Sequence, residues 1–192
     1  MIGIIPRLWV HTLRQIGTTE QVAQVLAAVG HPAHFEYALD QPYTDAECAA
    51  LMQASQEVLG LGEDVLFTAF ARTFMQDSLQ RWPVWFEMSP TARDFLERQP
   101  RIHDRFNRSL NRRDIHTGPV SPKFEVTSAP NGLLVFYRSP NKLCRLYMAM
   151  ARELLTHYQD HHATLHEPRC MHRDDEACEI HIRWPATAQR AA

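Results

Sequence analysis

The sequence contains no long apolar run, few cysteines and no excess of charge of either sign. No stretch approaches the roughly 18 apolar residues of a membrane span, and Pro6 and Arg7 interrupt the apolar start, which lacks the features of a signal peptide. Four cysteines in 192 residues are too few for a disulfide scaffold. The balance of 20 basic against 22 acidic residues argues against nucleic-acid binding, which usually needs a basic excess. We therefore expect one cytoplasmic domain that binds neither membranes nor nucleic acid.

Histidine is abundant by contrast. The chain has eleven histidines, and several of them lie in the C-terminal third together with three of the four cysteines. In a reducing compartment, cysteines are more often free, metal-bound or redox-active than bridged. Metal or cofactor chemistry is therefore the question that the composition raises.

Helical patterns fill the first two-thirds of the chain. Thr44 and Glu47 have the spacing of a capping box, and Ser89 followed by Pro90 is a typical helix start. Pro100 is expected to break the helix that begins there. The predicted helices are residues 44–60, 63–79, 89–99 and a further stretch from about residue 101.

The last third changes to the period-two pattern of strands. Residues 123–127 and 132–138 flank turn residues and predict a hairpin, residues 143–163 return to helical spacing, and residues 178–184 alternate again. The predicted fold class is α+β, with a helical N-terminal subdomain and a small antiparallel sheet with a long interposed helix. The expected single domain comprises residues 1–60 and 61–185, followed by a loose tail at 186–192.

His103 is the first candidate for cofactor chemistry. Phe106 and Leu110, three and seven residues later, place it on the apolar side of a helix. A neutral imidazole that projects into an apolar cavity is what haem iron requires as an axial ligand. Taken alone, the spacing fits even better a core histidine that bonds a backbone carbonyl, and both interpretations stay open at this point.

A second candidate is the segment at residues 136–141, where a strand passes into a helix. Tyr137, Ser139 and Asn141 supply hydrogen-bond donors at a helix start, which favours carboxylates or phosphates. The same residues are equally typical of a plain turn and cap.

The third candidate is a metal site formed by Cys144, His166, Cys170 and Cys178. Zinc readily takes three cysteines and one histidine, although the tight C-x-x-C knuckle is missing and Cys178 also fits a simple buried thiol. Cys48, far away in the chain, is interpreted as a core thiol. The competing ligands are His161, His162, His172 and Asp174.

In order and separation, these features resemble the haem nitric oxide/oxygen binding (H-NOX) domain, the sensor domain of soluble guanylate cyclase and of bacterial stand-alone sensors. The resemblance covers nearly the whole chain. Its elements are the Met-x-Gly-Ile-Ile start with Trp9, the acidic helix at residues 43–59, Phe95-Leu96 ahead of Ile102-His103, Pro122-x-Phe124, and Tyr137 with Ser139.

The resemblance implies a haem b cofactor between the two parts of the fold. His103 is then the axial ligand, and Pro122 presses on the macrocycle and distorts it. Asn141 stands where the family has arginine and donates a weaker, uncharged hydrogen bond, for which Lys142 or Arg145 is the substitute. The residues implied for the haem propionates are Tyr137, Ser139 and Asn141.

A bacterial subset of the family also carries a zinc site, which the four candidate ligands resemble. Cys144 follows the propionate motif as it does there. The separation from His166 to Cys170 is one residue longer than in that subset.

Gas selectivity follows from the position at which oxygen-binding members carry a distal tyrosine. In this chain that position is Leu146, and Tyr147 is expected to point about 100° around the helix. Phe74 and Leu146 then form an apolar distal wall that offers bound O2 no hydrogen bond. We therefore expect a sensor of nitric oxide (and CO) that excludes O2, is not an enzyme, and regulates in trans a histidine kinase or a cyclic-di-GMP enzyme.

Two alternatives belong to other classes. Asn141 favours a haem-free, zinc-stapled module that binds another ligand or senses redox state through its thiols. A metal-dependent phosphohydrolase would use His103-Asp104 with His161-His162, but a second suitably spaced acidic ligand is missing.

Overall fold

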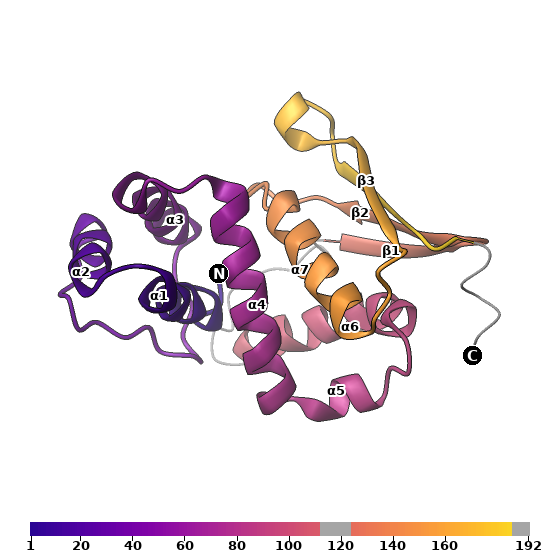
Figure 1. Ribbon diagram of the computed structural model, residues 1–192, viewed down its shortest axis with the longest axis horizontal. Helices are drawn as coiled ribbons and strands as arrows, with labels where there is room; N and C mark the ends of the chain where they lie inside the picture. Colours follow the sequence, from indigo (N-terminus) through magenta and orange to yellow (C-terminus); the bar gives the residue numbers. More distant parts are fainter. Residues whose placement is uncertain (112–123, 186–192) are drawn as a thin grey trace.

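The computed structural model describes residues 1–111 and 124–185 and confirms the α+β fold class. Figure 1 shows α1, α2 and α3 at one end of the molecule and the small sheet at the other, with α4 and α7 between them. In chain order the elements are α1 (Ile4–Ile16), α2 (Thr19–Ala28), α3 (Asp45–Leu59), α4 (Glu63–Arg81), α5 (Pro83–Glu87), α6 (Ala92–Asn111), β1 (Phe124–Ala129), β2 (Gly132–Tyr137), α7 (Cys144–His157), β3 (Thr164–Arg169), the 3₁₀ helix η1 (Met171–Arg173) and β4 (Cys178–Arg183). Within the described ranges, no helix combines the length and apolarity needed to cross a bilayer.

Helix α3 begins where the sequence predicts, but its cap is only half of a capping box. The Thr44 hydroxyl accepts the Glu47 N–H at 3.1 Å. The Glu47 carboxylate, instead of returning to Thr44, lies 2.8 Å from Nε2 of His31. Gly60 ends the helix in the left-handed conformation, as its place after the last periodic residue predicts.

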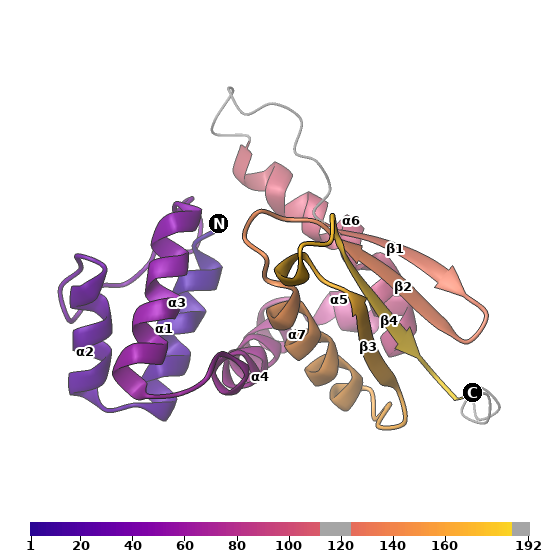
Figure 2. The same cartoon turned by 90° about the horizontal axis from the view of Figure 1, so that it is seen from above.

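The N-terminal helices enclose a first apolar core together with α4. Figure 2 shows α1, α2 and α3 on one side of the molecule, with α4 between them and the remaining elements. Trp9 of α1 lies at the centre of this core, against Phe67 and Phe70 of α4. Its indole N–H donates to the hydroxyl of buried Ser55 at 2.9 Å and so joins α1 to α3.

The four strands form an antiparallel sheet in the order β1-β2-β4-β3. This confirms the predicted hairpin and final strand, since Cys178, Ile180 and Ile182 are all buried on one face. Gly132 is required at the start of β2, because a Cβ there would lie 2.1 Å from the Ile182 carbonyl oxygen. The bounds of strand β3 do not follow from the sequence pattern, since its polar residues and Pro168 hide the alternation.

Helix α6 differs from the prediction at both its start and its interior. It begins at Ala92, where Thr91 and Asp94 cap it by reciprocal hydrogen bonds of 3.1 Å. Ser89 is not the cap, because its hydroxyl donates to the Trp85 carbonyl. Pro100 lies inside the helix and does not end it. Burial of Ala92 and Leu96, both fully inaccessible, offsets the backbone hydrogen bond that the proline removes.

Helix α7 contributes to two apolar cores. Leu146 and Ala149 pack into the N-terminal core, whereas Tyr147 and Leu154 pack into a second core between α6, α7 and the sheet. The helix ends at His157, six residues before the predicted end. The proposed division of the domain at residue 60 stays a prediction, and the proposed tail at 186–192 lies outside the described residues.

We predict that Ser55→Ala destabilises the protein by about 1–3 kcal/mol, because the buried Trp9 N–H then loses its acceptor. Urea unfolding of the haem-free protein measures this change. Thr156→Ala is the matched control, since the Thr156 hydroxyl also bonds a carbonyl four residues earlier but is exposed. Equal losses in the two variants would contradict the interpretation.

Candidate functional site

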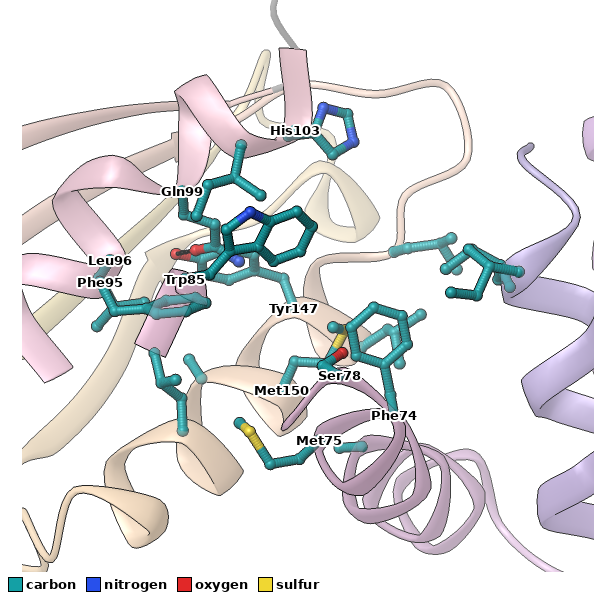
Figure 3. A pocket seen from close by; sticks show the side chains of 18 of the residues that line it. Phe74, Met75, Ser78, Trp85, Phe95, Leu96, Gln99, His103, Tyr147 and Met150 are labelled. Atoms are coloured by element: carbon teal, nitrogen blue, oxygen red, sulfur yellow. Dashed lines mark hydrogen bonds between the residues drawn. The ribbon is translucent and has the colours of Figure 1, made fainter. Parts of the chain in front are cut away.

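An apolar cavity of about 280 Å³ lies between the N-terminal residues, α4, α5, α6 and α7 (Figure 3). Its place between α1 and the C-terminal elements matches the location that the sequence implies for a cofactor. Most of its lining is aliphatic or aromatic. The polar side chains on its wall are Ser78, Gln99, His103, Tyr137, Asn141 and Tyr147.

His103 projects from α6 to the cavity, as the helical spacing predicts. The ring is half-buried (Figure 3). An imidazole on a mostly apolar wall is the kind of donor that suits an axial haem ligand. Pro122, the residue predicted to distort the macrocycle, lies outside the described residues.

Phe74 of α4 and Leu146 of α7 both line the cavity, in agreement with the predicted apolar wall. Tyr147 lines it too, and its hydroxyl donates to Oε1 of Gln99 on α6 at 3.2 Å. Burial raises the pKa of Tyr147, so the phenol remains a neutral donor. Ser78 is the polar exception on the α4 side, since its buried hydroxyl has no hydrogen-bond partner in the described part of the chain.

The segment from Tyr137 to Leu143 forms one edge of the cavity. Tyr137 and Asn141 line the cavity, whereas Ser139 is buried outside the lining. The Tyr137 hydroxyl accepts the Leu143 N–H at 3.2 Å, and burial raises the pKa of this phenol. The Ser139 hydroxyl accepts the Asn141 N–H at 3.4 Å. Two of the three residues predicted to bind propionates therefore reach the cavity, and the third supports their loop.

Neither predicted substitute for the family arginine lines the cavity. Arg145 forms an ion pair with Glu63 at 3.0 Å on the molecular surface. Lys142 adopts a left-handed backbone conformation, and its carbonyl lies 2.8 Å from the His172 ring. Asn141 is thus the side chain that occupies the position of the family arginine.

Three buried cysteines meet beside the start of α7. The Sγ atom of Cys170 lies 3.6 Å from that of Cys144 and 4.0 Å from that of Cys178. Tetrahedral zinc with Zn–S bonds of about 2.3 Å requires sulfur separations of about 3.8 Å. The sulfur spacing therefore fits a tetrahedral metal ion.

Glu167 completes this cluster, with all four ligand atoms within 4.8 Å of one another. Its Oε1 atom is buried and has no hydrogen-bond partner within the described residues. A buried carboxylate oxygen without a partner is costly, and a cation among the four side chains removes that cost. This oxygen without a partner is a second observation, independent of the sulfur spacing, that suits a cluster able to hold a metal.

The fourth position differs from the prediction, which placed His166 in the metal site. Successive side chains of a strand point to opposite faces. His166 therefore lies on the exposed face of β3 opposite His181, whereas Glu167 turns toward the cysteines. Glu167 also lies one residue closer to Cys170 and so removes the extra residue in the predicted spacing. The competing candidates His161, His162, His172 and Asp174 are not members of the cluster either.

Cys48 is separate from the cluster. It is buried in α3, and burial raises the pKa of its thiol to about 11. A thiol of this kind is inert at neutral pH. This agrees with its interpretation as a core residue.

A family model of haem-NO-binding proteins matches residues 2–166. The chain belongs to this H-NOX family. The resemblance inferred from the sequence is therefore confirmed, and with it a haem-binding sensor domain.

Solved H-NOX structures share the fold at low sequence identity. One, from a study of haem distortion in the H-NOX family, has a TM-score of 0.79 at 15% identity and covers 96% of this chain and 95% of its own. An oxygen-binding H-NOX domain related to soluble guanylate cyclases has a TM-score of 0.77 at 16% identity, with coverage of 95% and 94%. The S. oneidensis H-NOX protein in the Fe(II)NO state has a TM-score of 0.75 at 18% identity, with coverage of 96% and 99%. No curated protein matches the sequence.

We predict that Tyr137→Phe lowers stability by about 1–3 kcal/mol, because the Leu143 N–H at the start of α7 loses its acceptor. Urea unfolding of the haem-free protein measures the change. Phe136→Leu is a control on the other face of the same strand, where the side chain is 38% exposed. A Tyr137→Phe variant as stable as the wild type would show that this hydrogen bond does not support the loop.

Proposed function

We propose that this H-NOX domain is a nitric oxide sensor that binds NO and CO at ferrous haem b and excludes O2. The observation that carries the proposal is the projection of His103 into an apolar cavity that Phe74 and Leu146 also line. His103 is the residue that would ligate the iron, and Tyr137 and Asn141 lie at the cavity edge where propionates would be held. When bound, haem would supply a ferrous iron that binds diatomic gases.

The proposed exclusion of O2 rests on the predicted distal wall, where Phe74 and Leu146 offer bound gas no hydrogen bond. Bound O2 carries partial negative charge and gains from a hydrogen bond, whereas NO and CO need none. Phe74 and Leu146 have no donor, and the one proton of the Tyr147 hydroxyl is donated to Gln99. The Ser78 hydroxyl also lines the cavity, so a separate variant tests whether it donates to bound O2.

Signalling is proposed to act on a partner in trans and not through catalysis. If NO weakened the bond that His103 would form to haem iron, the helix that carries His103 would be able to relax and change the surface offered to the partner. The partner classes that the family resemblance supports are a histidine kinase and a cyclic-di-GMP enzyme. A cytoplasmic location also stays a prediction from the sequence.

The second candidate function is a haem-free module in which the cavity holds another apolar ligand. Two observations favour it. Asn141 lacks the charge of the family arginine, and the cavity volume of about 280 Å³ lies below the lower end of the usual range for ligand pockets. An absorption spectrum separates the two functions.

We predict that protein produced with sufficient haem shows a ferrous Soret band that shifts with NO and CO but not in air. His103→Ala is expected to lose or strongly weaken this band, because the iron loses its axial ligand. His34→Ala, which changes an exposed histidine that does not line the cavity, is the matched control. Haem-free wild-type protein would refute the sensor function. A stable spectrum of an oxygen complex would refute O2 exclusion, and Ser78→Ala would then show whether Ser78 is the donor.

We further propose that Cys144, Glu167, Cys170 and Cys178 bind one zinc ion. The three thiols and the unpartnered Glu167 oxygen support this ligand set. Zinc would tie the segment after β3 to β4 and to the start of α7, and its thiolates would be oxidisable. Burial raises the pKa of Cys144 and Cys178, so zinc binding must displace thiol protons. The apparent zinc affinity is therefore expected to fall as the pH drops.

We predict that purified protein contains one zinc per chain and that Cys170→Ser loses it. Glu167→Gln is expected to lower zinc affinity by about 10–100-fold, because the amide is a poorer ligand than the carboxylate. His166→Ala and Cys48→Ser are matched controls that retain the metal. Competition with a chelating dye measures the affinities. Loss of zinc in His166→Ala, with retention in Glu167→Gln, would overturn the assignment of the fourth ligand.

A further inference from the structure

Gln99 and Tyr147 form a contact between two walls of the cavity that haem binding itself does not explain. Tyr147 follows Leu146 on α7, and Gln99 precedes His103 by four residues on α6. The hydrogen bond of 3.2 Å from the Tyr147 hydroxyl to Oε1 of Gln99 therefore joins the wall of His103 to the wall of Leu146. Figure 3 shows Gln99 and Tyr147 beside each other in the cavity.

The surroundings of Tyr147 favour a fixed distance between α7 and Gln99. Tyr147 is only 7% exposed, and its ring packs into the core between α7 and the sheet. A hydrogen bond between neutral groups is stronger in such an apolar setting than in water. Residues four apart on a helix share one face, so a force on Gln99 acts on the same side of α6 as a force on His103.

Pro100 makes this contact more important for His103. It directly follows Gln99 and has no N–H, so α6 lacks the hydrogen bond to the carbonyl four residues earlier. Before this gap, α6 is held from outside, since the Arg98 guanidinium donates to the Met88 carbonyl at 2.7 Å. His103 follows this missing hydrogen bond along the helix. Gln99, the residue directly before Pro100, is the one bonded to Tyr147.

We propose that Gln99 and Tyr147 are positioning residues that set the separation between His103 and α7. The inference rests on the proposed function, because it concerns the bond from His103 to haem iron. Without the hydrogen bond, the His103 segment of α6 moves away from α7. The bond that His103 would form to haem iron would then be weaker, and NO would break it more readily.

The test uses the haem-loaded full chain and the variants Tyr147→Phe and Gln99→Leu, which each remove one partner. Resonance Raman spectroscopy of the ferrous protein measures the iron–histidine stretching band. The absorption spectrum with NO measures the ratio of five- to six-coordinate complex. Tyr158→Phe is the matched control, since Tyr158 donates to the Ser89 carbonyl at 2.8 Å between the end of α7 and the start of α6 but does not line the cavity.

We expect both variants to shift the iron–histidine band to lower frequency. The ratio of five- to six-coordinate complex should rise about two- to tenfold, because the loss of one neutral hydrogen bond changes an equilibrium constant by about this factor. The double variant should match either single variant, because all three lack the same bond. Tyr158→Phe should lose stability in urea without moving the band.

An unmoved band in both Tyr147→Phe and Gln99→Leu would overturn the inference, as would an equal shift in Tyr158→Phe. If Tyr147→Phe does not fold, Gln99→Leu alone decides between these outcomes. A wild-type protein without any iron–histidine band would overturn the proposed function and this inference together. The two failures are therefore distinguishable in the wild-type spectrum.

Discussion

The burial of α7 on two sides is the constraint on which the rest of the structure depends. Leu146 and Ala149 complete the N-terminal core, while Tyr147 and Leu154 complete the core under the sheet. A helix shared in this way fixes the position of α1–α4 relative to the sheet, and the cavity is the space that this arrangement leaves beside it. Since apolar burial is the main favourable term in folding, the cavity is maintained by the same packing that stabilises the domain.

Three chemical roles meet within the first turn of α7. Cys144 belongs to the cluster with Glu167, Cys170 and Cys178, Leu146 lines the cavity, and Tyr147 forms the contact with Gln99. The first residue of the helix is therefore linked to the segment after β3, and the fourth is linked to the helix that carries His103. A displacement of this turn would be felt at both places, because packed elements transmit strain and do not absorb it.

Local signals predicted those parts of the fold that local chemistry determines. The hairpin follows from alternation and turn residues, and the start of α3 follows from Thr44. Pro100 misled the prediction of α6, because the cost of a proline is local whereas the burial of Leu96 that offsets it is tertiary. The bounds of β3 were not predicted, because this edge strand carries polar side chains on both faces.

The candidate site shows the same contrast between local signals, which the sequence displays, and tertiary contacts, which it does not. His103, Phe74 and the three clustered cysteines were found from spacing and family resemblance. Glu167 was missed because histidine is the commoner zinc ligand, and only the alternation of β3 shows which of the two neighbouring side chains faces the thiols. The pairing of Gln99 with Tyr147 could not be predicted from the sequence, since 48 residues separate them.

Leu146 both lines the cavity and packs into the N-terminal core, and this bears on how gas preference could evolve. If Leu146 forms the distal wall as proposed, a mutation there would alter ligand chemistry and N-terminal packing at once, and a change of gas preference would require compensating substitutions in α1 or α4.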